Sequence, residues 1–310
     1  MGRFMKCWGV LLVLGMAMIL AACGETETGG SQDGEKLHVV TTISQIGEPL
    51  SVIGGDKITV ESLMGPSVDP HLYNPTQRDI QKLGDADIIF YSGLHLEANM
   101  VDMFASIGET KPVMAMGDAI PEDELLTDEN GAIDPHIWFD IDLWRKGLTA
   151  AVEQLKESSP ENADFFEENK QAYFAELDAL KQEAEKLSEI PKEHRFLVTA
   201  HDAFGYFGRL HDLEVIGLQG LSTESEVGVA DINNTIAIIK EYNVPAIFVE
   251  SSINQNTIQA VIEGAQSDGV DVSIGGELYS DAMGQPGTEE GTYIGMYRHN
   301  ISTIYKALNQ

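Results

Sequence analysis

The stretch VDPHLY at residues 68–73 is echoed by IDPHIW at residues 133–138, so the tripeptide Asp-Pro-His occurs twice. Proline fixes its own φ at about −65° and pushes the residue before it towards extended backbone. The histidine that follows therefore leaves a stiff backbone beside bulky apolar residues. Such a setting suits a metal ligand, because coordination tolerates little positional error. It also suits a turn whose histidine only packs or caps, and two copies leave both interpretations open.

The chain from Leu37 onwards alternates β-rich runs with segments of helical spacing. Strands are predicted at Leu37–Thr42, Ile58–Leu63, Asp87–Tyr91, Val113–Met116, Phe196–Ala200, Val215–Leu218, Ala246–Glu250 and Val270–Ile274. Helices are predicted at Ile43–Ile53, Thr76–Leu83, Glu97–Ile107, Asp231–Tyr242 and Asn254–Ser267. Strands separated by helices of this length indicate βαβ units and parallel sheets.

One long segment interrupts this alternation. Residues 163–190 carry apolar side chains at helical spacing among Glu, Lys, Gln and Asp, between Pro160 and Pro191. They predict one amphipathic helix of about 28 residues. The chain is therefore predicted to be an α/β protein in which two lobes with mostly parallel central sheets, residues 37–158 and 192–310, are joined by a rigid helical segment, residues 159–191.

The second half offers two further candidate ligands. His201 directly follows the predicted strand FLVTA, and Asp281 lies in a loop after the predicted strand VDVSI. Parallel sheets bind ligands at the carboxyl ends of their strands, so these residues and the two Asp-Pro-His histidines could close a four-ligand metal site between the lobes. Taken singly, His201 and Asp281 are equally compatible with structural roles. We expect the loops that carry them, the second flanked by glycines, to rearrange on binding.

The first 36 residues read as an export and anchoring segment. Residues 1–22 combine two cations with an apolar run of signal-peptide length and end in LAA before Cys23. This pattern resembles a bacterial lipobox and predicts lipid attachment at Cys23. An ordinary signal peptide followed by a chance cysteine is the alternative. Residues 23–36 are polar and glycine-rich and are expected to form a flexible tether.

The net charge of the chain excludes some classes of binding partner. The full sequence has a formal net charge of −31, and loss of the signal peptide, with its two cations and no anions, makes this −33. Such a charge argues against nucleic acid as a partner. It also repels anionic lipid, so the lipid anchor must hold the protein at the membrane. The sequence has no P-loop, HExxH or GxSxG motif, and we expect no enzymatic activity.

Five runs combine these features in a fixed order. They are SLMGPSVDPHLY at residues 62–73, DPHIW at 134–138, VTAHDAFGYFG at 198–208, GLQGLSTESE at 217–226 and LYSDAMG at 278–284. Together they resemble the metal-binding receptors of manganese and zinc ABC transporters, above all the manganese-binding lipoproteins of Gram-positive bacteria. The resemblance spans residues 37–310. It implies that the metal is bound in the cleft between the lobes by His71, His136, His201 and Asp281.

The resemblance also implies the protein's setting. It predicts a monomer that is lipid-anchored on the outer side of a Gram-positive cell membrane and delivers its metal to a permease driven by a separate ATPase. Mn²⁺ is expected as the transported ion. Zn²⁺ is the alternative, because three imidazoles and a carboxylate suit zinc, whereas the acidic segment at 118–133 lacks the histidine-rich loop typical of zinc receptors. A zinc-dependent hydrolase and an adhesin remain less favoured alternatives.

Overall fold

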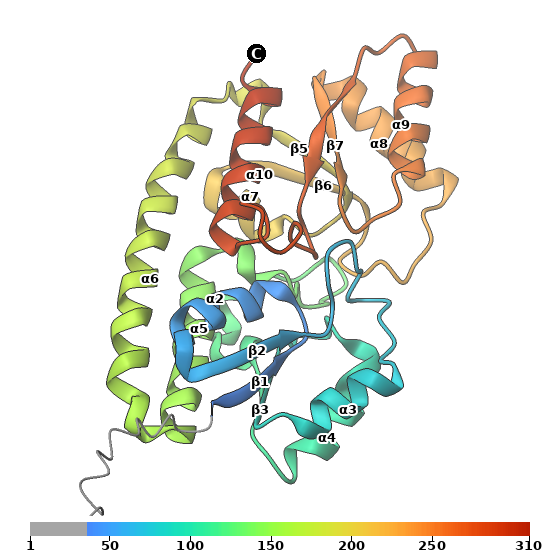
Figure 1. Ribbon diagram of the computed structural model, residues 1–310. Helices are drawn as coiled ribbons and strands as arrows, with labels where there is room; N and C mark the ends of the chain where they lie inside the picture. The colour runs from blue at the N-terminus through green and yellow to red at the C-terminus, as the bar shows by residue number, and fades with distance from the viewer. Residues whose placement is uncertain (1–35) are drawn as a thin grey trace, which may run out of the picture. The chain divides into compact units, whose positions relative to one another are not determined.

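The computed structural model describes residues 36–310, so the predictions for the signal peptide, for Cys23 and for nearly all of the tether lie outside the described residues. The first half of the described chain contains a four-stranded parallel sheet in the order β2-β1-β3-β4. Its strands are β1 (Leu37–Thr41), β2 (Ile58–Ser62), β3 (Ile88–Tyr91) and β4 (Val113–Ala115). Figure 1 shows α2 (Ser44–Gly54) on one side of this sheet and α3 (Gln77–Asp85) and α4 (Val101–Gly108) on the other.

The second half is also built on parallel strand pairs. β5 (Phe196–His201) pairs with β6 (Glu214–Gln219), and β7 (Ala246–Glu250) pairs with β8 (Ser273–Leu278). β5 and β7 lie side by side, and the backbone N–H of His201 donates a hydrogen bond of 2.9 Å to the side chain of Glu250. α8 (Val229–Tyr242) and α9 (Asn256–Ser267) lie together on one side of these strands (Figure 1). The predicted α/β class with parallel sheets in two lobes is confirmed.

The last strand lies further along the chain than predicted. The sequence predicted a strand at Val270–Ile274 that ends at two glycines, but β8 begins at Ser273 and continues through both of them. A Cβ atom on Gly275 would lie 2.7 Å from the Phe248 ring and 2.9 Å from Ala307 of the C-terminal helix. Glycine is needed there because strand and helix approach closely, not because the strand stops.

Three helices of the structure were not predicted. They are α5 (Ile141–Ser158), α7 (Gly205–His211) and α10 (Tyr293–Leu308). The side chain of Asp140 caps α5 by accepting hydrogen bonds from the N–H groups of Asp142 and Leu143, and Thr292 caps α10.

One apolar core runs from the first sheet through α5 and α6 to α7 and α10, whereas a smaller one fills the space under α8 and α9.

The long helix is shorter than the sequence predicted. α6 spans Ala163–Ala184, and a 3₁₀ turn at Glu185–Glu189 replaces the end of the predicted helix. Such tightening is common at the C-terminus of a helix. α6 packs against α2 and α5 of the first half and against α10 of the second half (Figure 1). Ion pairs tie it to both, from Asp178 to Arg145 of α5 and from Glu183 to Arg298 of α10.

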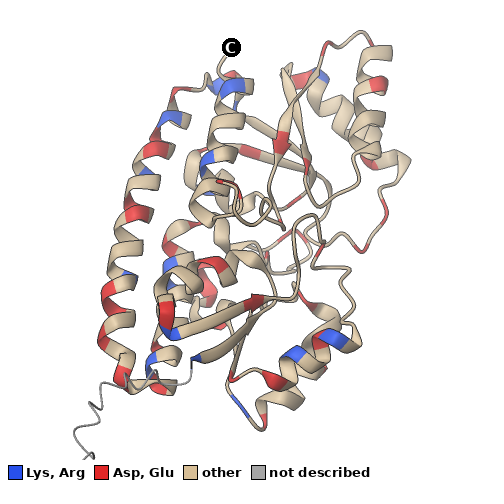
Figure 2. Ribbon diagram, viewed as in Figure 1, with Lys and Arg blue, Asp and Glu red and all other residues tan. Residues whose placement is uncertain are grey.

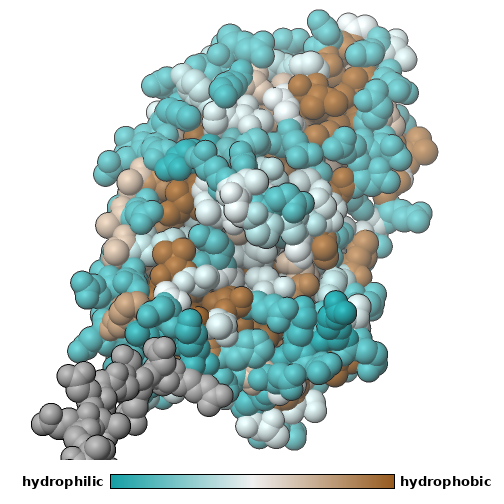
Figure 3. Space-filling model, viewed as in Figure 1, coloured by the Kyte–Doolittle hydropathy of each residue, from teal (hydrophilic) through white to brown (hydrophobic). Residues whose placement is uncertain are grey.

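The charged side chains do not gather at one place. Figure 2 shows acidic residues distributed over both halves and along α6, with few cations among them. Figure 3 shows a largely hydrophilic face interrupted by separate apolar areas. Within residues 36–310, no helix has the length and the apolar character needed to cross a bilayer. The acidic surface therefore gives a diffuse field and does not locate a binding site.

Burial on α6 gives a test of its role in the core. Leu177 is fully buried, whereas Gln182 on the same helix is exposed. Leu177→Ala should lower the free energy of unfolding by about 2–5 kcal/mol, because it removes buried methyl groups and leaves a cavity. Gln182→Ala should change it by less than about 0.5 kcal/mol. Chemical denaturation of both variants measures the difference, and equal effects would show that α6 does not contribute to the core in this way.

Candidate metal centre

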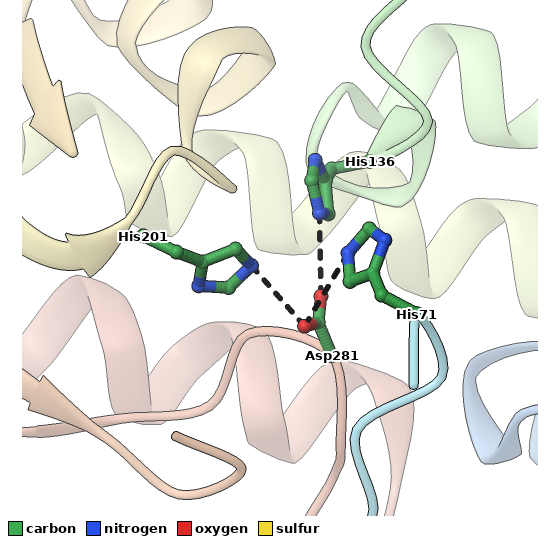
Figure 4. Close-up of side chains that lie close together, drawn as sticks. All are labelled: His71, His136, His201 and Asp281. Carbon is green, nitrogen blue, oxygen red and sulfur yellow. Dashed lines mark ion pairs between the residues drawn. The ribbon is translucent and has the colours of Figure 1, made fainter. Parts of the chain in front are cut away.

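The structure brings the four predicted ligands together. His71 lies in the loop after β2, His136 immediately precedes the 3₁₀ turn Ile137–Phe139, His201 ends β5, and Asp281 follows β8. Each offers one ligand atom, and these atoms all lie within 4.8 Å of one another. Figure 4 shows the three imidazole rings pointing at the carboxylate of Asp281. All four side chains are buried, with 3 % or less of each residue exposed.

Both Asp-Pro-His motifs form the same local turn. The carboxylate of Asp69 accepts a hydrogen bond of 2.9 Å from the backbone N–H of His71, and Asp134 accepts one of the same length from His136. An aspartate that binds the backbone two residues further on is a recurring turn element. Together with the fixed φ of the proline, this hydrogen bond directs each histidine out of its loop.

Asp281 is at the centre of the group. One of its carboxylate oxygens lies 3.3 Å from Nε2 of His136, and the other lies 3.1 Å from Nε2 of His201 and 3.8 Å from Nε2 of His71. Within the described part of the chain, both carboxylate oxygens and all three Nε2 atoms are buried without a hydrogen-bond partner. Buried polar atoms usually have partners, so these five point to a ligand that the protein itself does not provide.

Two of the three rings are held from behind by carboxylates. Nδ1 of His136 lies 2.7 Å from the carboxylate of Asp134, and Nδ1 of His201 lies 2.6 Å from that of Glu250. A carboxylate at Nδ1 fixes the orientation of the ring and leaves Nε2 to face the site, which is the usual support of a metal-binding histidine. No such partner at Nδ1 of His71 is found among residues 36–310.

The electrostatics of the group reflect these contacts. Burial opposes a charge on His136, but Asp134 and Asp281 outweigh it and raise the pKa of His136 to about 9. His201, also buried, has its pKa raised well above the usual value by Glu250 and Asp281. Burial lowers the pKa of His71 to about 3. The pKa of Asp281 is held well below its usual value because the neighbouring histidines outweigh its burial.

The geometry of this group suits a transition-metal ion. Ligand atoms placed tetrahedrally about 2.0–2.1 Å from a common ion lie roughly 3.3 Å from one another. The contacts of Asp281 with His136 and His201, at 3.3 and 3.1 Å, are close to that spacing. Imidazole nitrogens with a carboxylate oxygen are a donor set for divalent first-row metals. His71 is further away, at 3.8 Å from Asp281, and the ligand atoms as a set lie within 4.8 Å of one another, so the group would contract to hold such an ion.

Sequence reasoning assigned no role to Asp134 or Glu250. Asp134 was treated only as part of a turn. Glu250 was treated as the end of a strand, although a charged residue closing the apolar run AIFVE was a usable signal. The other histidines lie outside the group. His38 lies near the backbone of Asp85 and His299 near that of Glu277.

Fold and site together define a binding protein with two α/β lobes and a group of potential metal ligands drawn from both. Residues 39–307 match the family described as zinc-uptake complex component A periplasmic, ZnuA. The chain belongs to this family.

Individual relatives agree with this membership. The manganese-binding lipoprotein MntA of Bacillus subtilis is 47% identical over 298 residues, which are 96% of this chain and 97% of that protein. The manganese ABC transporter substrate-binding lipoprotein PsaA of Streptococcus pneumoniae is 31% identical over 98% of this chain and 99% of that protein. The solved structure of the periplasmic zinc binding protein TroA from Treponema pallidum superposes with a TM-score of 0.87 at 45% identity. It covers 89% of this chain and 100% of that chain.

The support of His201 by Glu250 can be tested directly. Glu250→Gln keeps the shape of the side chain but removes the charge at Nδ1 of His201. We expect it to weaken metal binding by about 10- to 100-fold, as is typical for such partners. Glu263→Gln on the exposed face of α9 is the matched control and should have no effect. Calorimetry measures both, and unchanged affinity in Glu250→Gln would exclude this role.

Proposed function

We propose that this protein is the substrate-binding lipoprotein of an ABC transporter and that it captures a divalent transition metal, with Mn²⁺ as the cargo. The observation that carries the proposal is the buried group of His71, His136, His201 and Asp281, whose inward atoms lack hydrogen-bond partners within the described residues. Family membership and the names of MntA and PsaA support both the transport role and the choice of manganese.

Zinc is the second candidate cargo. Three imidazoles and one carboxylate bind zinc more tightly than manganese when both ions are equally available, and the similar protein TroA is named a zinc binding protein. The absence of histidine from residues 118–133 favours manganese. Uptake of Mn²⁺ and of Zn²⁺ by cells with and without the protein would distinguish the two, with loss of manganese uptake if the first candidate is correct.

We propose that the ion is held as cargo and not used in catalysis. A hydrolase would need an open coordination position for water and a free general base. The carboxylates behind the rings, Asp134 and Glu250, are already engaged by His136 and His201. Hydrolysis of ester or phosphoester substrates by the metal-loaded protein above the rate of free metal would contradict this part of the proposal.

Substitution of each of the four ligands should weaken metal binding, whereas substitution of another histidine should not. We expect a loss of metal affinity of more than about 100-fold in each of four variants, His71→Ala, His136→Ala, His201→Ala and Asp281→Ala. This is more than the loss expected when a residue that only supports a ligand, such as Glu250, is changed. Each variant should retain the fold, as judged by circular dichroism. His38→Ala, at a histidine far from the group, is the control. Equal losses in the control and the four variants would refute the ligand assignment.

Metal binding should depend on pH through His136. Its pKa is raised to about 9, so at neutral pH the metal-free ring is protonated and a bound ion must displace that proton. The pKa of His201 is also raised, by Glu250 and Asp281 against its burial, so the same holds for that ring. Apparent affinity should therefore rise by about tenfold per unit of pH for each proton displaced across the neutral range. Competition with a chelator measures this trend between about pH 6.5 and 8.5. An affinity that does not change over this range would show that no ligand proton is displaced and would contradict the protonated state of His136.

The anchor is a separate part of the proposal. We propose that Cys23 carries lipid and holds the protein on the outer face of a Gram-positive membrane, where it delivers its cargo to the permease. Cys23→Ser should release the protein from the membrane fraction without changing its affinity for metal, because no proposed ligand lies near that end of the sequence. Retention of Cys23→Ser in the membrane would show that the anchor has been misassigned.

A further inference from the structure

The four ligands are not held equally, and the difference separates His71 from the other three. The segment around His136, residues 134–139, is fixed to the second half by several hydrogen bonds. Nε1 of Trp138 donates to the backbone oxygen of Ser280 at 3.2 Å, next to Asp281. Three tyrosine hydroxyls of the second half donate to backbone oxygens of this segment. They run from Tyr206 to Asp134, from Tyr293 to Trp138 and from Tyr297 to Phe139.

His136, His201 and Asp281 therefore form one braced unit, although His136 comes from the first half of the sequence. Both of its histidines have a carboxylate at Nδ1. The backbone oxygen of Ser280 is bound a second time, by the side-chain amide of Gln45 at 3.2 Å. Movement of any of these three ligands would break several buried hydrogen bonds, each of which is costly to leave unmade.

The His71 segment has a much lighter attachment. Within residues 36–310, one side-chain hydrogen bond joins residues 65–75 to the second half, from the hydroxyl of Thr223 to the carboxylate of Asp69 at 2.6 Å. The same carboxylate accepts the N–H of His71. Asp69 thus takes a different role from Asp134. Asp134 supports the ring of its own histidine, whereas Asp69 binds a loop of the other half.

A cavity reaches the ligand group at this point. It has a volume of about 650 Å³ and is lined by His71, by residues of the 128–135 segment and by Gly220, Leu221, Ser222 and Ser225. The loop that supplies Thr223 thus forms part of the cavity wall. His136, His201 and Asp281 are not among its lining residues. Of the four ligands, His71 is the one that faces this open space.

We propose that the Thr223–Asp69 hydrogen bond is a clasp that controls metal exchange past His71. With the clasp closed, Asp69 holds the His71 segment against the 220–225 loop and the ion is enclosed. When it opens, His71 leaves the ion first and the cavity becomes the exit, while the other three ligands stay in place. Thr223 and Asp69 are positioning residues that bind no metal. This inference rests on the proposed function, since it concerns release of the same cargo.

The test measures how fast the loaded, full-length protein releases Mn²⁺ to an excess of chelator. Thr223→Val removes the hydroxyl but keeps the shape of the side chain. We expect release to become about tenfold faster or more, as when a hydrogen bond to a charged acceptor is lost. Thr223→Ser restores a hydroxyl and should return the rate towards that of the unchanged protein. Thr257→Val, which removes a hydroxyl that donates to the nearby backbone oxygen of Asn254, is the matched control.

The outcomes separate the clasp from the proposed function and from a general loss of stability. Faster release in Thr223→Val, with an unchanged unfolding midpoint of the metal-free protein and rescue by serine, supports the clasp. An unchanged release rate, or faster release that follows a lower unfolding midpoint or is also seen in Thr257→Val, overturns it. Failure of the unchanged protein to bind Mn²⁺ or Zn²⁺ would instead refute the proposed function itself.

Discussion

The buried carboxylate of Asp281 faces three imidazole rings, and the rest of the structure is arranged so that this contact can exist. Removing a charge from water costs several kcal/mol unless partners compensate for it. Here the partners come from both halves of the chain, so the two halves must be held in a fixed position relative to each other. The continuous core through α5, α6, α7 and α10 fixes this position, and the ion pairs of α6 with α5 and α10 add further links along the helix.

The two Asp-Pro-His motifs show how one local sequence can serve two purposes. Both form the same backbone turn and direct a histidine at the same point. Their surroundings differ. Tyr206 and Tyr293 donate hydrogen bonds to the second motif, and its own Trp138 donates one to Ser280. Among the described side chains, Thr223 alone bonds the first motif to the other half. A receptor that must bind an ion tightly and later give it up needs both properties. Three braced ligands give geometry and selectivity, and one lightly held ligand gives a route for exchange.

Much of this could be predicted from the sequence because the signals were local. Strand ends, the alternation of strands and helices, and the repeated motif placed His71, His136, His201 and Asp281 correctly in the loops and strand ends where they lie. The partners of these residues were not predictable, because Glu250 and Thr223 meet the site only through tertiary packing. The glycines of β8 were taken as a break, although their purpose is close contact with Phe248 and α10. The glycines near Asp281 suggested that its loop moves, whereas Ser280 beside it is bound by both Gln45 and Trp138.

X-ray absorption at the metal edge of the Mn²⁺-loaded protein tests the central claim most directly, because it reports the atoms around the ion. The account predicts a first shell of imidazole nitrogens and one or two carboxylate oxygens at about 2.0–2.3 Å. It also predicts the outer-shell scattering of about three imidazole rings, in keeping with His71, His136 and His201. A first shell of six oxygens without imidazole scattering would contradict it, since the ion would then be bound elsewhere on the acidic surface.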